Sequence, residues 1–258
     1  MWNNELKAAI EAGLKAKEKI MEIYNTLFDV EIKDDNSPVT LADKTADKMI
    51  REHLSKLFPD YAFLTEESED DIRRLDNDHV WIVDPVDGTK DFVARDNEFT
   101  TNIALSYKNE IVVGIVIIPA SDEYYYAIKG EGAFKVKGDI VTRIHVNDKV
   151  NDLTVLTSRF HVCQNELDMI EKHSDRIKNV KCFGSSIKAC KIASGLAEIS
   201  YRLSSGTKEW DTAAIQIIVE EAGGVFVKPN GERMFYNRKD VYNREGYIIT
   251  NRKENILL

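Results

Sequence analysis

Cysteine is scarce in this chain, and the few residues present form no recognisable pattern. Three occur among 258 residues, at Cys163, Cys182 and Cys190. Their odd number and their spacing match neither a disulfide framework nor a paired metal-binding motif. We therefore expect reduced thiols and no redox function.

Long apolar runs and an excess of positive charge are also missing. No stretch approaches the roughly 20 apolar residues of a membrane span, and the polar N-terminal segment lacks the apolar block of a signal peptide. The formal net charge of −9 argues against nucleic-acid polymers and anionic membranes as partners, because both require a basic surface. We expect a cytoplasmic protein. A small anionic substrate stays open, since bound cations can reverse the local field.

The apolar content suffices for substantial cores, because 43% of the residues are hydrophobic. Polar residues around 146–153 predict a domain boundary, which divides the chain into an N-terminal α+β domain, 1–148, and a C-terminal α/β domain, 149–258. The predicted helices are 3–27, 40–58, 165–171, 185–194 and 211–221. The predicted strands are 61–65, 79–83, 98–105, 111–118, 124–128, 133–136, 154–157, 180–183, 198–203, 225–227 and 247–250. The strongly charged stretch 68–78 is expected to be exposed.

The stretch 81–92 reads Trp-Ile-Val-Asp-Pro-Val-Asp-Gly-Thr-Lys-Asp-Phe and concentrates the reactive side chains. Pro85 should end the preceding strand, because proline has no N–H to donate to a sheet. Asp84 and Asp87 would then leave the strand end together. Two carboxylates 4 Å apart repel each other by roughly 1 to 4 kcal/mol, so we expect a cation between them. Hard oxygen ligands favour Mg²⁺.

A turn suited to anions follows these carboxylates. Gly88 lets the backbone approach a ligand closely, and the turn into Thr89 and Lys90 can open a helix whose free N–H groups attract an anion. Cation and anion sites side by side are typical of metal-assisted hydrolysis of a phosphate ester. Taken alone, however, Asp-Pro-x-Asp-Gly more often marks a loop than a site.

Other acidic residues at segment ends have ordinary structural interpretations. Asp43 follows the polar connection 34–40 and would be a first-turn acid in a helix capped by Thr40. Glu66 and Glu67 end a predicted strand, and adjacent side chains on a strand point to opposite sides. At most one of these two glutamates should therefore face a metal site, and the alternation leaves either one open. Residues 184–185 and Asp211 would by default be helix caps.

Together these segments resemble the signatures of the lithium-sensitive, magnesium-dependent phosphatase superfamily. Its members include inositol monophosphatases, 3'(2'),5'-bisphosphate nucleotidases and fructose-1,6-bisphosphatases. The resemblance rests on stretch 81–92, on Trp-Asp-Thr-Ala-Ala at 210–214, on Glu-Glu-Ser at 66–68 and on Ser-Pro-Val-Thr at 37–40 with Asp43. It spans nearly the whole chain. It implies a layered α/β/α/β/α sandwich and a phosphomonoesterase that lithium inhibits.

The resemblance also implies two or three Mg²⁺ ions in each active site. One ion would contact Glu66, Asp84 and the backbone carbonyl of Val86. A second ion would contact Asp84, Asp87 and Asp211, so that Asp84 bridges the two.

The resemblance assigns the catalytic roles to a threonine and its acidic partners. Thr89 and Asp43, near Glu66, would help to deprotonate a water on the first ion, which would attack phosphorus in line. Backbone N–H groups at Gly88 and Thr89 should hold a phosphate oxygen.

Substrate contacts are expected from Gly88, Thr89, Lys90, the Gly184-Ser185 turn, Lys208 and Glu209. Lys90 favours the bisphosphate nucleotidases, because this position is usually uncharged in the inositol enzymes and a second phosphate would give it a charge-assisted contact. The stretch 201–209 should line the leaving-group pocket, and it departs from the Tyr-Pro-Arg pattern of many bacterial nucleotidases.

We therefore expect a small phosphorylated substrate, adenosine 3',5'-bisphosphate first. An inositol or sugar phosphate phosphatase is the alternative, and a nucleotide-binding protein without turnover is a third hypothesis. A monomer or a homodimer is expected.

Overall fold

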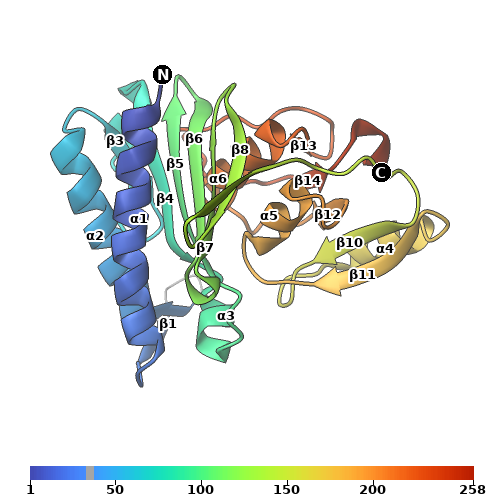
Figure 1. Ribbon diagram of the computed structural model, residues 1–258, viewed down its shortest axis with the longest axis horizontal. Coiled ribbons are helices and arrows are strands. Elements are labelled where there is room, and N and C mark those ends of the chain that lie inside the picture. The colour runs from blue at the N-terminus through green and yellow to red at the C-terminus, as the bar shows by residue number, and fades with distance from the viewer. Residues whose placement is uncertain (33–37) are drawn as a thin grey trace.

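The chain begins with two neighbouring helices, which form the first layer of the structure (Figure 1). The computed structural model describes residues 1–32 and 38–258. Helix α1 (Asn3–Tyr24) buries a stripe of small residues, which allows α2 (Leu41–Leu57) to approach closely. A short antiparallel pair, β1 (Val30–Ile32) and β2 (Pro38–Thr40), joins them. Of the predicted polar connection 34–40, residues 34–37, which include Ser37 of the family segment, lie outside the described residues, and the rest forms β2.

The second layer is a seven-stranded sheet in the order β3-β4-β5-β6-β7-β8-β9. Its strands are β3 (Ala62–Thr65), β4 (His79–Asp87), β5 (Thr100–Tyr107), β6 (Glu110–Ile118), β7 (Glu123–Ile128), β8 (Gly132–Lys137) and β9 (Ile140–Ile144). Only the pairing of β3 with β4 is parallel. Apolar clusters cover both faces, as the near-continuous apolar runs of β5 and β6 predicted. Strand β9 was not predicted, because four of its five residues are exposed at the sheet edge.

The third layer consists of α5 (Ile187–Ala193) and α6 (Glu209–Glu221). Helix α6 packs against β5 and β6 at the face of the seven-stranded sheet that α1 and α2 leave uncovered. Gly114 on β6 permits this contact, because a Cβ atom there would lie 2.7 Å from the carbonyl oxygen of Ala214. The helix therefore lies close to the sheet.

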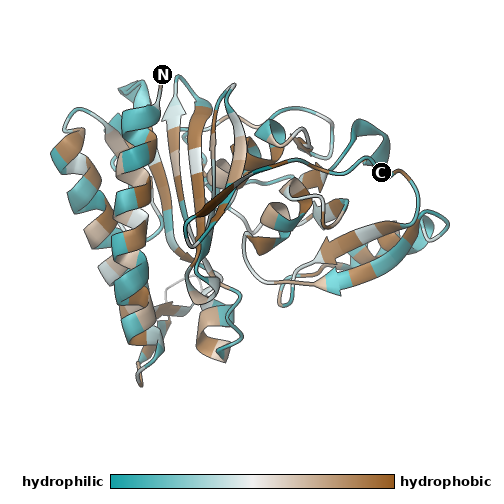
Figure 2. Cartoon of the chain, in the orientation of Figure 1, coloured by the Kyte–Doolittle hydropathy of each residue, from teal (hydrophilic) through white to brown (hydrophobic). Residues whose placement is uncertain are grey.

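The fourth layer is a five-stranded sheet in the order β11-β10-β12-β14-β13. Its strands are β10 (Leu153–Thr157), β11 (Ile177–Cys182), β12 (Ile199–Arg202), β13 (Val225–Val227) and β14 (Tyr247–Thr250). Helix α4 (Gln164–Lys172) covers its outer face as the fifth layer, since Met169 and Ile170 pack against the apolar cluster that includes Val155 and Ile248. Apolar residues gather on the strands between the helical layers (Figure 2). The predicted α/β/α/β/α sandwich is thus confirmed.

Short helices complete the described chain: η1 (Ile72–Asp76), α3 (Thr89–Ala94), η2 (Pro119–Ser121) and η3 (Lys253–Asn255). Every strand of the large sheet precedes residue 148, and every strand of the smaller sheet follows it. The division into domains 1–148 and 149–258 stays a prediction. Within the described residues, no helix combines the length and the apolar character that crossing a membrane requires.

Strand β4 runs further than the sequence predicted. It continues through Pro85 to Asp87, with an irregularity in its pairing to β5 between Asp84 and Asp87. On its other side, pairing with β3 already stops at Val83, so the missing N–H of Pro85 breaks no hydrogen bond there. The expectation that Pro85 ends the ladder was wrong. The irregularity nevertheless matters, because side chains three residues apart on a regular strand would point to opposite faces.

Candidate active site

Three carboxylates from two distant parts of the chain meet at one point. Asp84 and Asp87 come from the end of β4, and Asp211 comes from the first turn of α6. Carboxylate oxygens of all three lie within 4.8 Å of one another. They line a single cavity of about 450 Å³. The structure therefore brings together the carboxylates that the sequence analysis named as ligands of the second ion.

Each of these carboxylates accepts a hydrogen bond that fixes its orientation. The donors are Ser186 Oγ to Asp87 (2.8 Å), Val86 N–H to Asp84 (3.1 Å) and Lys208 N–H to Asp211 (2.5 Å). Asp87 also accepts from Thr100 Oγ1 at 3.2 Å. The carboxylates are thus held in place by neighbouring groups of the protein.

Burial and mutual repulsion act strongly on this cluster. Burial is the main cause that raises the pKa of Asp84 far above its usual range, followed by the charges of Glu66, Asp87 and Asp211. The pKa of Asp211 rises to about 8, again through burial first and then through Asp87 and Glu66. Ionising all of these groups requires positive charge between them. Close, oriented oxygen donors fit a hard divalent cation such as Mg²⁺.

Glu66 and Val86 join the cluster from adjacent strand ends. Glu66 directly follows β3, and its N–H donates to the carbonyl of Val83 on β4 at 3.2 Å. Both Glu66 and Val86 line the cavity. The five proposed metal ligands therefore border one space, and their roles as ligands stay a prediction.

Thr89 and Asp43 form a hydrogen-bonded pair beside the carboxylates. Thr89 Oγ1 lies 3.1 Å from Asp43 Oδ1 and 3.2 Å from the carbonyl oxygen of Val86. The other oxygen of Asp43 accepts from Thr40 N–H at 2.8 Å and Thr40 Oγ1 at 2.6 Å, which forms the predicted capping box of α2. Asp43 is buried, and this burial raises its pKa despite those hydrogen bonds. Its carboxylate therefore orients the Thr89 hydroxyl.

The turn that carries Thr89 depends on Gly88. This glycine has φ +90°, and a Cβ there would lie 3.1 Å from the Cβ of Ser185. A side chain would be strained in this conformation and would crowd the cavity. Lys90, the next candidate along, is exposed and also lines the cavity.

Further basic side chains line the same cavity. His161 and Lys188, which the sequence analysis did not single out, join the predicted Lys90 and Lys208 and also Arg202 of the predicted pocket stretch 201–209. The pKa of His161 falls to about 4, through burial first and then through the charges of Arg202, Lys90 and Lys188. Its imidazole is thus neutral at pH 7 among three cations, an arrangement that attracts an anion. These residues come from separate segments, so no local motif connects them.

Comparison with known proteins places this arrangement in a family. A profile described as the inositol monophosphatase family matches residues 1–257. The chain belongs to this family. It is 33% identical over 248 residues to the 3'(2'),5'-bisphosphate nucleotidase CysQ of Salmonella typhimurium, which covers 95% of this chain and 99% of that protein.

Solved structures of family members agree with the fold. CysQ of Bacteroides thetaiotaomicron, described as a bacterial member of the inositol monophosphatase family, matches with a TM-score of 0.86 and 34% identity. The match covers 98% of this chain and 99% of that one. The extragenic suppressor protein suhB of Bartonella henselae matches with a TM-score of 0.82 and 28% identity, covering 97% of each chain. The similarity therefore extends through both sheets.

The glycine-serine turn at 184–185 was expected near the substrate from the family resemblance. In the structure, its two residues have different surroundings. Ser185 lines the cavity in a left-handed conformation, φ +46°, and its buried Oγ has no hydrogen-bond partner among the described residues. Gly184 is buried behind it, and its N–H donates to Glu98 Oε2 at 2.7 Å. Ser185 is therefore positioned to contact a ligand, whereas Gly184 positions the turn.

Glu209 was expected to contact the substrate, and the structure places it elsewhere. Its side chain is fully buried and does not line the cavity. Its two oxygens accept hydrogen bonds from the backbone N–H groups of Asn237 and Arg238, at 2.7 and 2.8 Å. Arg238 also pairs with it through Nε at 3.0 Å. Glu209 therefore anchors the start of α6, and its predicted contact with the substrate was wrong.

A second acidic group lies at α3 and is already paired with an arginine side chain. Oxygens of Asp91, Asp96 and Glu98 lie within 4.8 Å of one another. Arg159, which follows β10, approaches Glu98 at 2.6 Å, Asp96 at 3.1 Å and Asp91 at 3.4 Å. Burial and then the charge of Asp96 raise the pKa of Asp91 to about 7. This group is an ion-pair network that joins the two sheet regions.

Proposed function

We propose that this protein is a Mg²⁺-dependent phosphomonoesterase of the 3'(2'),5'-bisphosphate nucleotidase type. Its substrate would be adenosine 3',5'-bisphosphate, and its products would be AMP and phosphate. The proposal rests on one observation: a cluster of carboxylates and a group of basic side chains line the same cavity. The names of the CysQ relatives support it. We further propose a cytoplasmic enzyme, monomeric or homodimeric, that lithium inhibits.

The carboxylate cluster would hold the ions. Glu66, Asp84 and the Val86 carbonyl would hold one Mg²⁺, and Asp84, Asp87 and Asp211 would hold another. When bound, these ions polarise the phosphate ester, lower the pKa of water and neutralise developing charge.

The remaining residues of the site would position the substrate and the nucleophile. The Thr89 hydroxyl would accept a hydrogen bond from the attacking water and take its proton while passing its own proton to Asp43, to which it donates at 3.1 Å. N–H groups at Gly88 and Thr89 would hold a phosphate oxygen. In-line attack of water on phosphorus would break the bond to the leaving oxygen, so no covalent enzyme intermediate forms.

The basic side chains explain the preference for two phosphates. One phosphate would lie at the carboxylate cluster, where the ions supply positive charge. The other would find Lys90, Lys188 and Arg202, whose charges lower the pKa of His161 after the larger effect of burial. A monophosphate of inositol or of a simple sugar would leave these cations unused. That class is the alternative, and the description of the matching family as inositol monophosphatases is what favours it.

Phosphate release measured with Mg²⁺ tests the proposal. The panel compares adenosine 3',5'-bisphosphate, inositol 1-phosphate and fructose 1,6-bisphosphate. The nucleotide should give the highest kcat/KM. A higher kcat/KM for inositol 1-phosphate would overturn the choice of substrate, and no release from any of the three would overturn the enzyme.

Lys90 provides a sharper test of the second phosphate. Lys90→Ala should lower kcat/KM for adenosine 3',5'-bisphosphate more than for adenosine 3'-monophosphate. Lys44→Ala is a matched control, because Lys44 is also exposed but pairs with Glu31 rather than lining the cavity. Equal losses on both nucleotides would remove the reason for preferring a bisphosphate.

A further inference from the structure

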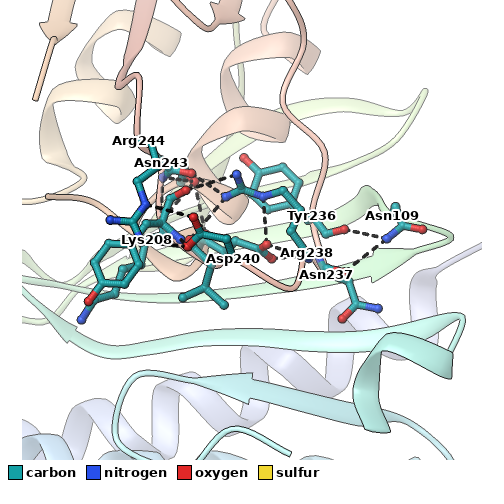
Figure 3. Close-up of polar contacts among 12 residues, drawn as sticks. Asn109, Lys208, Tyr236, Asn237, Arg238, Asp240, Asn243 and Arg244 are labelled. Atoms are coloured by element: carbon teal, nitrogen blue, oxygen red, sulfur yellow. Dashed lines mark hydrogen bonds and ion pairs between the residues drawn. The ribbon is translucent and has the colours of Figure 1, made fainter. Parts of the chain in front are cut away.

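Residues 236–246, here called the wall segment, lie between β13 and β14 and are tied to the start of α6 (Figure 3). Arg238 lies at the centre of this network. Its guanidinium group donates to Asn243 Oδ1 at 2.7 Å and to the carbonyl of Tyr242 at 3.3 Å, and it pairs with the buried Glu209. The wall segment is therefore attached to the helix that carries Asp211.

The same segment is also attached to the loop before α6. Asn243 donates through its N–H to the carbonyl of Thr207 at 2.8 Å, and through Nδ2 to the carbonyl of Lys208 at 2.9 Å. Lys208 and Tyr242 pair as an isolated antiparallel bridge. The backbone of Tyr242 is therefore fixed relative to Lys208, three residues before Asp211.

The other end of the wall segment is anchored in the protein interior. Asn109 Nδ2 donates to the carbonyl of Tyr236 at 2.8 Å, as Figure 3 shows. Arg74 donates to Asn237 Oδ1 at 2.8 Å, and Asn237 Nδ2 donates back to the carbonyl of Arg74 at 3.0 Å. Arg74 is only 1% exposed. The segment is thus held at both ends, and Tyr242, its residue at the cavity, is preorganised.

Tyr242 is the aromatic side chain that this segment presents to the cavity. Its ring is half-buried and lines the cavity, whereas Tyr236 in the same segment is fully buried and donates to Gln216. The Arg244 guanidinium lies 4.3 Å from the centre of the Tyr242 ring and is itself paired with Asp240. Core packing accounts for Tyr236, whereas Tyr242 keeps part of its surface at the cavity.

Lys208 connects this ring to a second aromatic side chain. Its ammonium group lies 5.5 Å from the centre of the Tyr242 ring and 5.2 Å from that of Trp210. Cation–π contacts of this kind hold both the lysine and the rings in place. The cavity therefore has a rigid wall of aromatic and cationic groups close to Asp211.

We propose that Tyr242 determines substrate specificity by stacking with the base of a nucleotide, while Lys208 holds the ring in place. The inference rests on the proposed function, because Tyr242 would contact the nucleoside part of the proposed substrate's leaving group. Stacking on an aromatic ring strengthens the binding of any planar nucleotide base. Replacing such a ring with alanine lowers the affinity on the order of tenfold or more. An inositol or sugar ring has no π face and would gain little there.

A pair of ligands that differ only in the base isolates this contact. Adenosine 5'-monophosphate and ribose 5-phosphate share the sugar and the phosphate, so their difference in Kd, measured by calorimetry with Mg²⁺ present, reports the base. Wild-type protein should bind the nucleotide on the order of tenfold more tightly. Tyr242→Ala should remove that difference, and Tyr242→Phe should retain it. Tyr242→Leu keeps apolar volume without a π face and replaces the alanine variant if that one fails to fold.

Steady-state kinetics provide a second measurement. Tyr242→Ala should raise KM for adenosine 3',5'-bisphosphate about tenfold while kcat changes much less, because the base lies away from the reacting phosphorus. If the alanine and leucine variants keep the wild-type preference for the nucleotide over ribose 5-phosphate, the inference is overturned. It is also overturned if they weaken both ligands equally. Failure of the proposed function is distinguishable, since it would be seen as no turnover of adenosine 3',5'-bisphosphate by the wild-type protein.

Discussion

Replacing Asp84 with asparagine should change stability in opposite directions with and without metal. Oxygens of Asp84, Asp87 and Asp211 lie within 4.8 Å of one another. Two unit charges at that distance repel by about 3.5 kcal/mol at an effective dielectric constant of 20. The raised pKa of Asp84 means that protonation already relieves part of this repulsion. We therefore expect Asp84→Asn to raise the free energy of unfolding by about 1 to 3 kcal/mol in chelator.

The same substitution should abolish the stabilisation by Mg²⁺. A ligand at 100 times its Kd stabilises a folded protein by about 2.7 kcal/mol, and the asparagine variant should lose this response because the bridging carboxylate is gone. Its amide oxygen can still accept the hydrogen bond from Val86 N–H, so the local backbone is preserved. Less than a tenth of the wild-type phosphate release should remain.

Urea unfolding with chelator and with Mg²⁺ measures both effects. Asp47→Asn is the matched control, because Asp47 is also buried but pairs with Arg51 at 2.8 Å and Ser68 at 2.7 Å away from the cluster. The control should lose stability and keep its Mg²⁺ response. The reasoning is refuted if Asp84→Asn destabilises the metal-free protein as the control does, or if it still responds to Mg²⁺.

Three further predictions concern pH and the ion pairs. The pKa of Asp211 is about 8 in the folded state and 3.8 ordinarily, so the folded protein binds more protons between these values. Without metal, the stability measured by thermal unfolding should therefore fall as the pH rises from about 5 to about 8. Saturating Mg²⁺ should weaken this dependence of stability on pH, and the same dependence with and without Mg²⁺ would contradict the prediction. Arg159→Gln should lower the free energy of unfolding by about 2 kcal/mol at pH 8. The loss should be smaller at pH 5.5, where Asp91, with a pKa of about 7, is protonated; an equal loss at both pH values would argue against the network. Glu209→Ala should cost about 3 kcal/mol or more in urea unfolding, because Arg238 and two backbone N–H groups lose their acceptor. A loss below 1 kcal/mol would show that this anchor is weak.

Local patterns predicted much of the fold because they determine where elements begin and end. Thr40 and Asp43 form the capping box that their spacing indicated. Helix α1 ends at Tyr24 rather than 27, a boundary that periodicity alone does not fix. Strand β9 escaped prediction because an exposed edge strand carries little apolar alternation. Pro85 was expected to stop β4, but this expectation ignored the neighbouring strand, which had already ended.

The site residues also differ in whether a local motif identifies them. Asp84, Asp87 and Asp211 were found because their side chains stand in recognisable motifs. His161 and Lys188 join the cavity only through the packing of separate elements, and no sequence spacing encodes that.

A charged residue is also wrongly predicted to be exposed when its partner lies far away in the sequence. Arg74 lies in a charged stretch expected to be exposed, yet it is buried against Asn237 and the carbonyl of Arg238. Glu209 is buried for the same reason: its partners lie nearly 30 residues further along the chain.

The position of α6 affects how the protein could be cut into fragments. This helix follows residue 148 in the chain, yet it packs on the large sheet that precedes residue 148. A fragment ending near 148 would expose the apolar face around Gly114, and its complement would carry a helix with no sheet to cover. The two pieces should therefore be insoluble when expressed singly and should recover only when they are produced together.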